Sequence, residues 1–117
     1  MFKHKQTGIK GEQIAVKFLQ NSGYSILERN WRHGKKEVDI IAKKDDILII
    51  AEVKTRNNYD FGFPEEAVNT KKQEFLREAA MAYIEIHRQH TDIRFDIISI
   101  LLDKEAVKEI LHFEAAF

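Results

Sequence analysis

The chain has 117 residues, of which 44% are hydrophobic and 32% charged, and its formal net charge is zero. This length fits one domain, and the composition is ordinary for a soluble globular protein. The absence of cysteine excludes disulfides and thiolate metal sites and favours a cytoplasmic location. No apolar run approaches the ~18 residues that span a membrane, and the basic start Met1–Lys5 lacks the apolar segment of a signal peptide. Zero net charge argues against a pure nucleic-acid binder but leaves room for an enzyme with an acidic site inside a basic rim.

The first predicted element is a helix from about Ile9 to Gln20. Apolar residues recur in it at helical spacing, at Ile9, Ala15, Val16 and Leu19. Gly23 ends this helix, and Tyr24–Leu27 starts an extended segment.

Two strands joined by a polar turn are predicted next. Glu37–Ala42 alternates charged and apolar residues with the period of a strand. Lys43–Asp46 is the turn, and Ile47–Thr55 is apolar on both faces, which indicates a central strand.

A second, longer helix follows a loop over Asn57–Phe63. Pro64 suits a first helical turn, and Thr70 with Gln73 matches a capping box. The helix runs to about His87 and buries an apolar stripe formed by Phe75, Leu76, Ala79, Ala80 and Tyr83.

Two final strands are expected over Arg94–Leu102 and Lys108–Phe113. The element order is therefore α-β-β-β-α-β-β, in one domain covering residues 1–117. This order predicts an α/β or α+β fold, with a mixed β-sheet flanked by helices.

Glu52 and Lys54 are two residues apart on the central strand, so they project from the same face. They end an otherwise apolar row that contains Leu48 and Ile50. Charges in a buried strand are unfavourable unless they are paired or bound to a metal. The alternative is a strand that emerges into solvent with a salt bridge at its end.

Asp39 on the preceding strand shares a face with Glu37. If paired positions across the hairpin add to 89 or 91, Asp39 lies on the face of Glu52; an even sum would turn it away. In the odd register two or three carboxylates and one lysine converge, and like charges repel unless a cation lies between them. These oxygen ligands suit Mg²⁺ or Mn²⁺, and the pattern lacks the histidine and cysteine ligands of zinc.

A further carboxylate, Glu12, lies on the apolar stripe of the first helix. An acid there invites a functional interpretation; the alternative is that it stabilises the helix dipole from the edge of the core. A divalent ion held by Asp39 and Glu52 would polarise the scissile phosphate and activate water. Lys54 would orient that water or offset charge in the transition state.

Basic residues suggest a surface for nucleic acid. Arg29, Arg32, Lys35 and Lys36 precede the strand of Asp39, with Trp31 among them, which suits phosphate contacts and base stacking. The alternative is a solvated loop with Trp31 in the core. Arg56 either continues the charged face of the central strand or marks an exposed strand end. Lys71 and Lys72 are a phosphate anchor at a helix start or simply solvated charge.

Several segments, in order over nearly the whole chain, resemble the YraN family of bacterial proteins. They are Gly11-Glu12, Arg29-Asn30-Trp31-Arg32, Glu37-Val38-Asp39-Ile40-Ile41-Ala42, Glu52-Val53-Lys54-Thr55-Arg56, Lys71-Lys72, Arg94-Phe95-Asp96 and His112-Phe113-Glu114-Ala115-Ala116-Phe117. The resemblance implies kinship with PD-(D/E)xK nucleases and with archaeal Holliday-junction resolvases. It implies a restriction-endonuclease-like core with four residues at catalytic positions: Glu12, Asp39, Glu52 and Lys54. Val38 stands where the motif has proline.

The leading hypothesis is a metal-dependent endonuclease that hydrolyses phosphodiester bonds in DNA, including branched or structured forms. Its metal ligands would be Asp39, Glu52 and Glu12, its cofactor Mg²⁺ or Mn²⁺, and its partner DNA, with a homodimer as a further option and no membrane. The rival is a non-catalytic nucleic-acid-binding module with the same fold. A third option, a structural partner protein, would leave the clustered acids unexplained.

Overall fold

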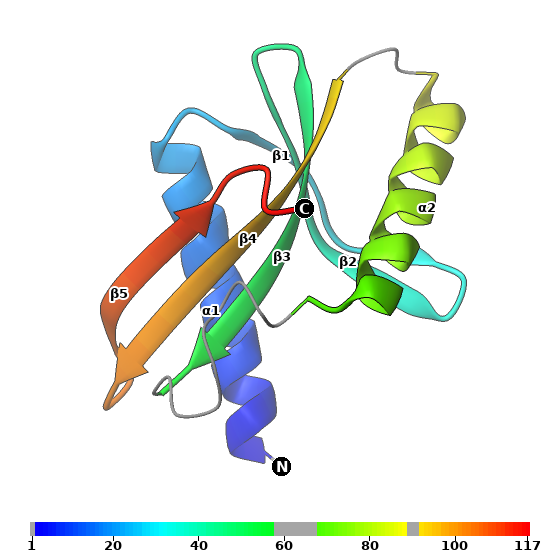
Figure 1. Cartoon of the computed structure of the whole chain (residues 1–117). Coiled ribbons are helices and arrows are strands. Elements are labelled where there is room, and N and C mark those ends of the chain that lie inside the picture. Colours follow the sequence, from blue (N-terminus) through cyan, green and yellow to red (C-terminus); the bar gives the residue numbers. More distant parts are fainter. Residues whose placement is uncertain (1, 58–67, 89–91) are drawn as a thin grey trace.

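The computed structural model describes residues 2–57, 68–88 and 92–117, with side chains from residue 8 onward (Figure 1). The elements follow the predicted order: α1 Phe2–Asn21, β1 Ser25–His33, β2 Lys36–Lys44, β3 Ile47–Arg56, α2 Thr70–His87, β4 Asp92–Asp103 and β5 Ala106–Phe113. The strands form one sheet in the order β1-β2-β3-β4-β5, so β3 is central, as predicted. Only β3 and β4 run parallel, with α2 between them in the chain. The predicted mixed sheet flanked by helices is confirmed.

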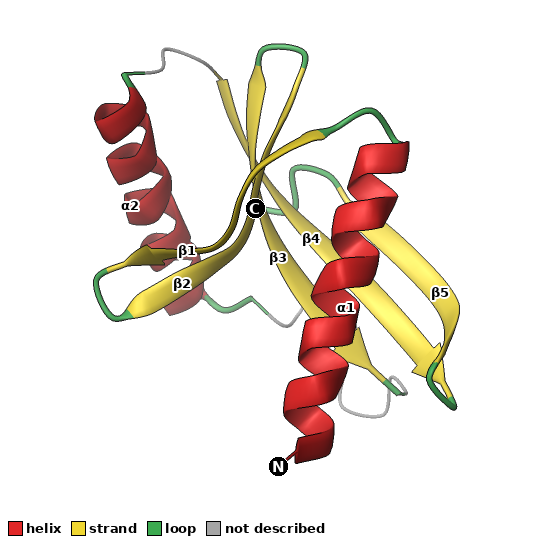
Figure 2. Cartoon of the chain, turned by 180° about the vertical axis from the view of Figure 1, so that it is seen from behind, coloured by secondary structure: helices red, strands yellow, loops and turns green. Residues whose placement is uncertain are grey.

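The two helices cover opposite faces of the sheet (Figure 2). One buried cluster joins α1 to the sheet through Ala15, Leu19, Tyr24, Ile40, Ala42, Ile49, Ala51, Ile98, Ile100 and Leu102. The other cluster joins α2 to the opposite face through Phe75, Leu76, Ala79, Ala80, Tyr83, Val38, Ile41, Leu48, Ile50 and Ile97, with Val68 before the helix. The two apolar faces of β3 therefore bury against both layers, and the predicted stripe of α2 is confirmed.

Helix α1 differs from its prediction at the N-terminal end, because it begins at Phe2 and not near Ile9. Ile9 is 48% exposed, so its assignment to the apolar stripe was wrong. The buried stripe starts at Gly11, where a Cβ would lie 1.8 Å from Thr55 Oγ1. The missing side chain allows α1 to approach the end of β3 closely, and this places Glu12 there.

Helix α2 is capped by Asn69 and not by the predicted capping box at Thr70. Asn69 is extended (φ −77°, ψ 172°), and its side-chain oxygen accepts a hydrogen bond of 2.9 Å from the backbone nitrogen of Lys72. The Gln73 side chain instead donates to the carbonyl of Val68 at 3.0 Å. Both Asn and Thr favour the cap position, and the extended backbone at Asn69 decides between them. The predicted loop after Asn57 and the helix start at Pro64 lie outside the described residues.

Strand β2 leaves β3 partway along the sheet. Their pairing stops at Ile40 and Ala51, although β2 goes on pairing with β1 and β3 goes on pairing with β4 as far as Arg56. Figure 1 shows the β1–β2 hairpin turning away from β3 towards α2. This opening, which we call the fork, leaves backbone groups of β3 without a partner in β2. Neither helix of the described chain is long and apolar enough to cross a membrane.

Candidate active site

The fork brings Asp39 next to Glu52. Paired positions of β2 and β3 add to 91, as in Ile40 with Ala51, so the next position sets Asp39 opposite Glu52. The odd register that the sequence favoured is confirmed. The strands have already separated there, and the Asp39 carboxylate accepts a 2.8 Å hydrogen bond from the backbone nitrogen of Val53. Asp39 thus replaces a missing strand partner and is fixed beside Glu52.

Glu52 is buried without full compensation. Only 5% of the residue is exposed, and its Oε2 atom has no hydrogen-bond partner among the described residues. Oε1 lies 3.7 Å from Lys72 Nζ on α2. Burial, followed by the charge of Asp39 and a hydrogen bond shared with it, raises the pKa of Glu52 to about 8. The alternative of a strand end in solvent is therefore wrong at Glu52, and its ion pair reaches α2.

Lys54 is half-buried two residues further along β3. Its charge, like that of Lys72, lowers the pKa of Glu52, although burial and Asp39 prevail. The carboxylate pair therefore has cations from two elements around it. Sequence reasoning anticipated Lys54 but assigned Lys72 only to a DNA surface.

Glu12 faces the same site from α1. Burial, and then the charge of Asp39, raises the pKa of Glu12 above its ordinary value. Asn30 and the Arg29 charge counter this shift. With its amide nitrogen turned towards Glu12, Asn30 donates to the two carboxylate oxygens at 3.0 and 3.3 Å. Asn30 has a left-handed backbone (φ 52°), which asparagine tolerates well.

The carboxylate pair has the chemistry of a divalent-cation site. Asp39 and Glu52 supply oxygen ligands, and the partnerless Oε2 of Glu52 is the kind of atom that a cation satisfies. Among the side chains described in residues 8–57, 68–88 and 92–117, however, no three acidic or histidine groups are placed to hold one ion. Two carboxylates fit Mg²⁺, which commonly takes its other ligands from water and substrate phosphates. Glu12 as a third ligand stays a prediction.

The predicted basic residues surround this site unevenly. Arg29 and Arg32 are exposed on β1, and Lys71 is exposed in the first turn of α2. Arg32 makes an exposed ion pair of 3.5 Å with Glu37. Glu37 is therefore not a third carboxylate beside Asp39 and Glu52. Arg56 is half-buried at the end of β3. Their contacts with nucleic acid stay predictions.

Trp31 is partly buried and packs on the core, as in the alternative that places it there. It packs against the α2-side cluster, with its ring edge-on to Tyr83 at a centroid distance of 5.2 Å. His33 stacks on Trp31 at 6.0 Å and lies 6.1 Å from the Phe75 ring. These aromatic contacts attach the β1–β2 hairpin to α2 and hold the fork open.

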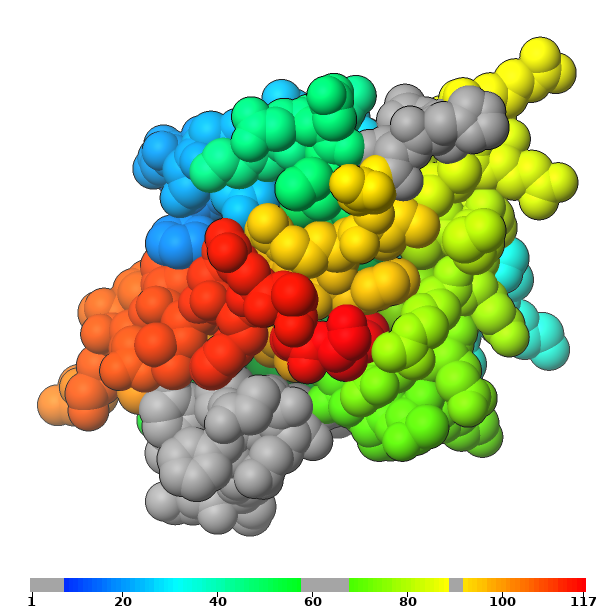
Figure 3. Space-filling model, turned by 45° about the horizontal axis from the view of Figure 1, so that its top comes forward, coloured from blue at the N-terminus to red at the C-terminus, as the bar shows by residue number. Residues whose placement is uncertain are grey.

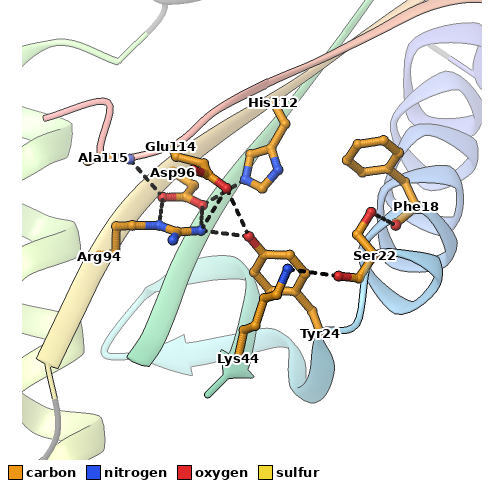
Figure 4. Close-up of polar contacts among 9 residues, drawn as sticks. All are labelled: Phe18, Ser22, Tyr24, Lys44, Arg94, Asp96, His112, Glu114 and Ala115. Atoms are coloured by element: carbon orange, nitrogen blue, oxygen red, sulfur yellow. Dashed lines mark hydrogen bonds and ion pairs between the residues drawn. The ribbon is translucent and has the colours of Figure 1, made fainter. Parts of the chain in front are cut away.

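A second polar centre, around Asp96 on β4, was missed by sequence reasoning (Figure 4). Asp96 is fully buried, and Arg94 binds its two carboxylate oxygens at 2.9 and 2.8 Å. His112 Nε2 lies 2.7 Å from Oδ2, and the backbone nitrogen of Ala115 donates to Oδ1 at 3.0 Å. Burial alone would raise the pKa of Asp96, but the hydrogen bonds from His112 and Arg94 outweigh it and hold the pKa below its ordinary value. A lone acid within the apolar run Ile93–Leu102 was the available signal.

The same centre attaches the C-terminal residues to the sheet. Arg94 also donates to the Tyr24 hydroxyl at 2.7 Å, and that hydroxyl donates to Glu114 at 3.2 Å. The backbone nitrogen of Ala116 donates to the carbonyl of Phe95 at 2.8 Å, and Phe117 stacks on the Phe95 ring at 5.3 Å. Figure 3 shows the red C-terminal segment lying between β5 and α2. This centre is structural, because its polar groups are satisfied by one another.

Comparison with known proteins places these features in a family. The model of the uncharacterised protein family UPF0102 matches residues 11–100. A UPF0102 protein of Flavobacterium psychrophilum is 46% identical over 117 residues, which cover 100% of this chain and 98% of the relative. One from Christiangramia forsetii is 44% identical with the same coverage. One from Dictyoglomus thermophilum is 46% identical over 112 residues, 95% of this chain and 93% of the relative.

Proposed function

The chain belongs to the UPF0102 family, the YraN family that its motifs resemble, and we propose that it is a metal-dependent endonuclease acting on DNA. One observation carries the proposal. Asp39 and Glu52 are held side by side at the fork, and Lys54 follows two residues after Glu52 on β3. Within the described part of the chain, Glu52 keeps a buried oxygen without a hydrogen-bond partner. A purely structural pair of acids would gain stability from full hydrogen bonding, which Glu52 lacks.

Asp39 and Glu52 are the residues that would hold Mg²⁺ or Mn²⁺. When bound, the ion would polarise the scissile phosphate and lower the pKa of water. Once Glu52 is ionised, its burial strengthens its attraction for a cation, because little water screens the charge. The hydrogen bond from Val53 fixes Asp39, so the pair is oriented before any ligand arrives.

Lys54 supplies positive charge beside the reacting phosphate. Its place two residues after Glu52 sets both side chains on one face of β3, within reach of the same phosphate group. There the ammonium orients the attacking water or offsets charge on the phosphorane-like transition state. Glu12 acts from the α1 side, where Asn30 and Arg29 favour its charged form.

DNA, including branched or structured forms, is the proposed substrate. Arg29 on β1 and Lys71 on α2 are exposed near the two ends of the carboxylate group, since Arg29 influences Glu12 and the neighbouring Lys72 reaches Glu52. Basic side chains on both sides of an acidic centre attract a phosphate backbone to the place where hydrolysis would occur. Arg32 and Arg56 extend this basic rim.

The decisive experiment compares Lys54→Ala with Lys43→Ala on linear, single-stranded and four-way DNA in Mg²⁺ or Mn²⁺. Lys43 also lies on a strand and is half-buried, but it is at the far end of the sheet, opposite Leu48. Lys54→Ala should cut the cleavage rate ~100-fold or more, because a positioned catalytic charge is lost. Its DNA binding should weaken by only ~1–2 kcal/mol, the contribution of one charged hydrogen bond. Lys43→Ala should match the wild type in both assays.

Two results would contradict the proposal in different ways. If the wild type binds DNA but cleaves none of the three substrates with either metal, the chain is a non-catalytic binding module. If the wild type cleaves and Lys54→Ala cleaves equally fast, the nuclease function stands but the active site is elsewhere.

A further inference from the structure

Lys72 occupies a different position from the other basic residues predicted at a DNA surface. Its Nζ atom lies 3.7 Å from Glu52 Oε1, while its neighbour Lys71 is exposed on the same helical turn. The same ammonium lies 5.3 Å from the centre of the Phe75 ring. Lys72 is therefore held inward by a carboxylate and an aromatic face.

The two partners of the Lys72–Glu52 ion pair differ in how deeply they are buried. The Lys72 side chain is 31% exposed, whereas that of Glu52 is 6% exposed. A distance of 3.7 Å is an ion pair but too long for a good hydrogen bond. The carboxylate is thus fixed in the interior, while the ammonium is on a long flexible side chain with access to solvent.

A divalent cation and Lys72 would compete for the same atoms. Among the described residues, Lys72 and Lys54 are the cations whose charge acts on Glu52. Two cations a few ångströms apart repel each other, and the repulsion is stronger where water is excluded. Arrival of a metal at Glu52 therefore favours movement of the mobile ammonium outward, towards the side on which DNA would lie.

We propose that Lys72 is an exchangeable counter-charge, which pairs with the ionised Glu52 carboxylate while no divalent cation is bound and contacts a DNA phosphate once the cation is bound. This inference rests on the proposed function. It makes metal binding and DNA binding cooperative through one side chain, and linkage requires that each then strengthens the other. Lys72 is accordingly a positioning residue for the carboxylates before it is a phosphate contact.

Calorimetric titration of Mn²⁺ without DNA, at about pH 8 where much of Glu52 is ionised, tests the first half. Lys72→Ala should bind Mn²⁺ roughly 3–10-fold more tightly than the wild type, because no ammonium has to be displaced. Lys71→Ala removes the same charge from the same helical turn and should change the affinity less than about twofold. Lys72→Met, which keeps the packing on Phe75, should behave like Lys72→Ala and replaces it if that variant is unstable.

DNA binding at a series of salt concentrations, with and without Ca²⁺, tests the second half. With Ca²⁺ the wild type should show a salt slope about one unit steeper than that of Lys72→Met, and without Ca²⁺ the two slopes should agree. If the wild type binds no Mn²⁺, the metal site of the proposed function is wrong and this inference falls with it. If the wild type binds Mn²⁺ but the Lys72 variants bind it equally or more weakly, only the counter-charge inference is overturned. A difference in salt slope between the wild type and Lys72→Met that is the same with and without Ca²⁺ would also overturn the counter-charge inference, and would leave the proposed function standing.

Discussion

Two buried carboxylates in this protein have opposite surroundings. Asp96 is fully buried, both of its oxygens are hydrogen-bonded, and its pKa lies below the ordinary value. Glu52 is nearly as buried, one of its oxygens has no hydrogen-bond partner in the part of the chain that the structure describes, and its pKa is raised to about 8. The two carboxylates are buried to a similar degree and lie on adjacent parallel strands. Burial alone therefore does not explain why their pKa values shift in opposite directions. The cause is the number of hydrogen-bond donors: several surround Asp96, whereas Glu52 lacks a full set.

The comparison makes Asp96 a source of stability. Asp96→Asn should lower the free energy of unfolding by about 3–5 kcal/mol, because it leaves Arg94 as a poorly paired cation in a half-buried site. Urea denaturation would measure this loss. Glu114→Gln is the matched control, since Glu114 contacts the same Arg94 at 3.6 Å with a side chain 60% exposed, and it should cost less than ~1 kcal/mol. Equal effects in the two variants would remove the distinction drawn for Asp96.

The comparison also makes Glu52 a source of instability. Its folded pKa of about 8 lies above its ordinary value of 4.5, so the protonated form is favoured in the native state. The stability that the protonated form of Glu52 contributes is therefore fully present below about pH 4.5 and is lost as the pH rises towards 8. Glu52→Gln should raise the free energy of unfolding by roughly 2 kcal/mol at pH 8, less than the full value of the pKa shift, because a buried amide also lacks partners.

The gain should disappear when unfolding is measured near pH 4.5. Glu37→Gln removes an exposed acid from the neighbouring strand and should show no such trend between pH 4.5 and 8. A Glu52→Gln protein that is less stable than the wild type at pH 8 would show that the carboxylate is compensated after all.

Gly11 tests the packing of α1, the helix that connects the two centres. Helix α1 lies near Glu52 at Gly11, and its C-terminal end leads to Tyr24 of the Asp96 centre. Gly11→Ala should reduce stability by about 1–2 kcal/mol, because the new Cβ would overlap Thr55. Gly8→Ala in the same helix meets no atom within 4 Å and should instead stabilise by up to ~1 kcal/mol. Differential scanning calorimetry of the two variants would measure both shifts. If both stabilise, the close approach of α1 to β3 is not maintained in solution.

The sequence predicted most of the framework because its local signals agreed. Period-two alternation located β2, a run that is apolar on both faces located β3, and the parity of their register placed Asp39 beside Glu52. The apolar stripe of α2 was predicted residue for residue. The start of α1 was not, since the first turns lack an apolar stripe and Ile9 is exposed there.

The candidate site was predictable where it depended on neighbouring strands and not where it depended on distant ones. Asp39, Glu52 and Lys54 lie on a single hairpin, so strand periodicity was sufficient. Lys72 reaches Glu52 only because α2 packs over β3, which no spacing rule indicates. The contacts of Asp96 come from β5 and the residues after it, and local sequence carries no information about that pairing.

The parallel pairing of β3 with β4 has a consequence for the order in which contacts can form. The β2–β3 hairpin closes over Asp45 and Asp46 alone, whereas β3 meets β4 by pairing Ile47 with Asp92, 45 positions later. The entropy lost on closing a loop grows with its length, so the hairpin is entropically the easier contact. A chain that has formed only its local contacts already holds Asp39 beside Glu52, with both side chains still hydrated. Dehydration of that pair requires α2 to pack on the same face of β3, a contact that the hairpin alone does not supply.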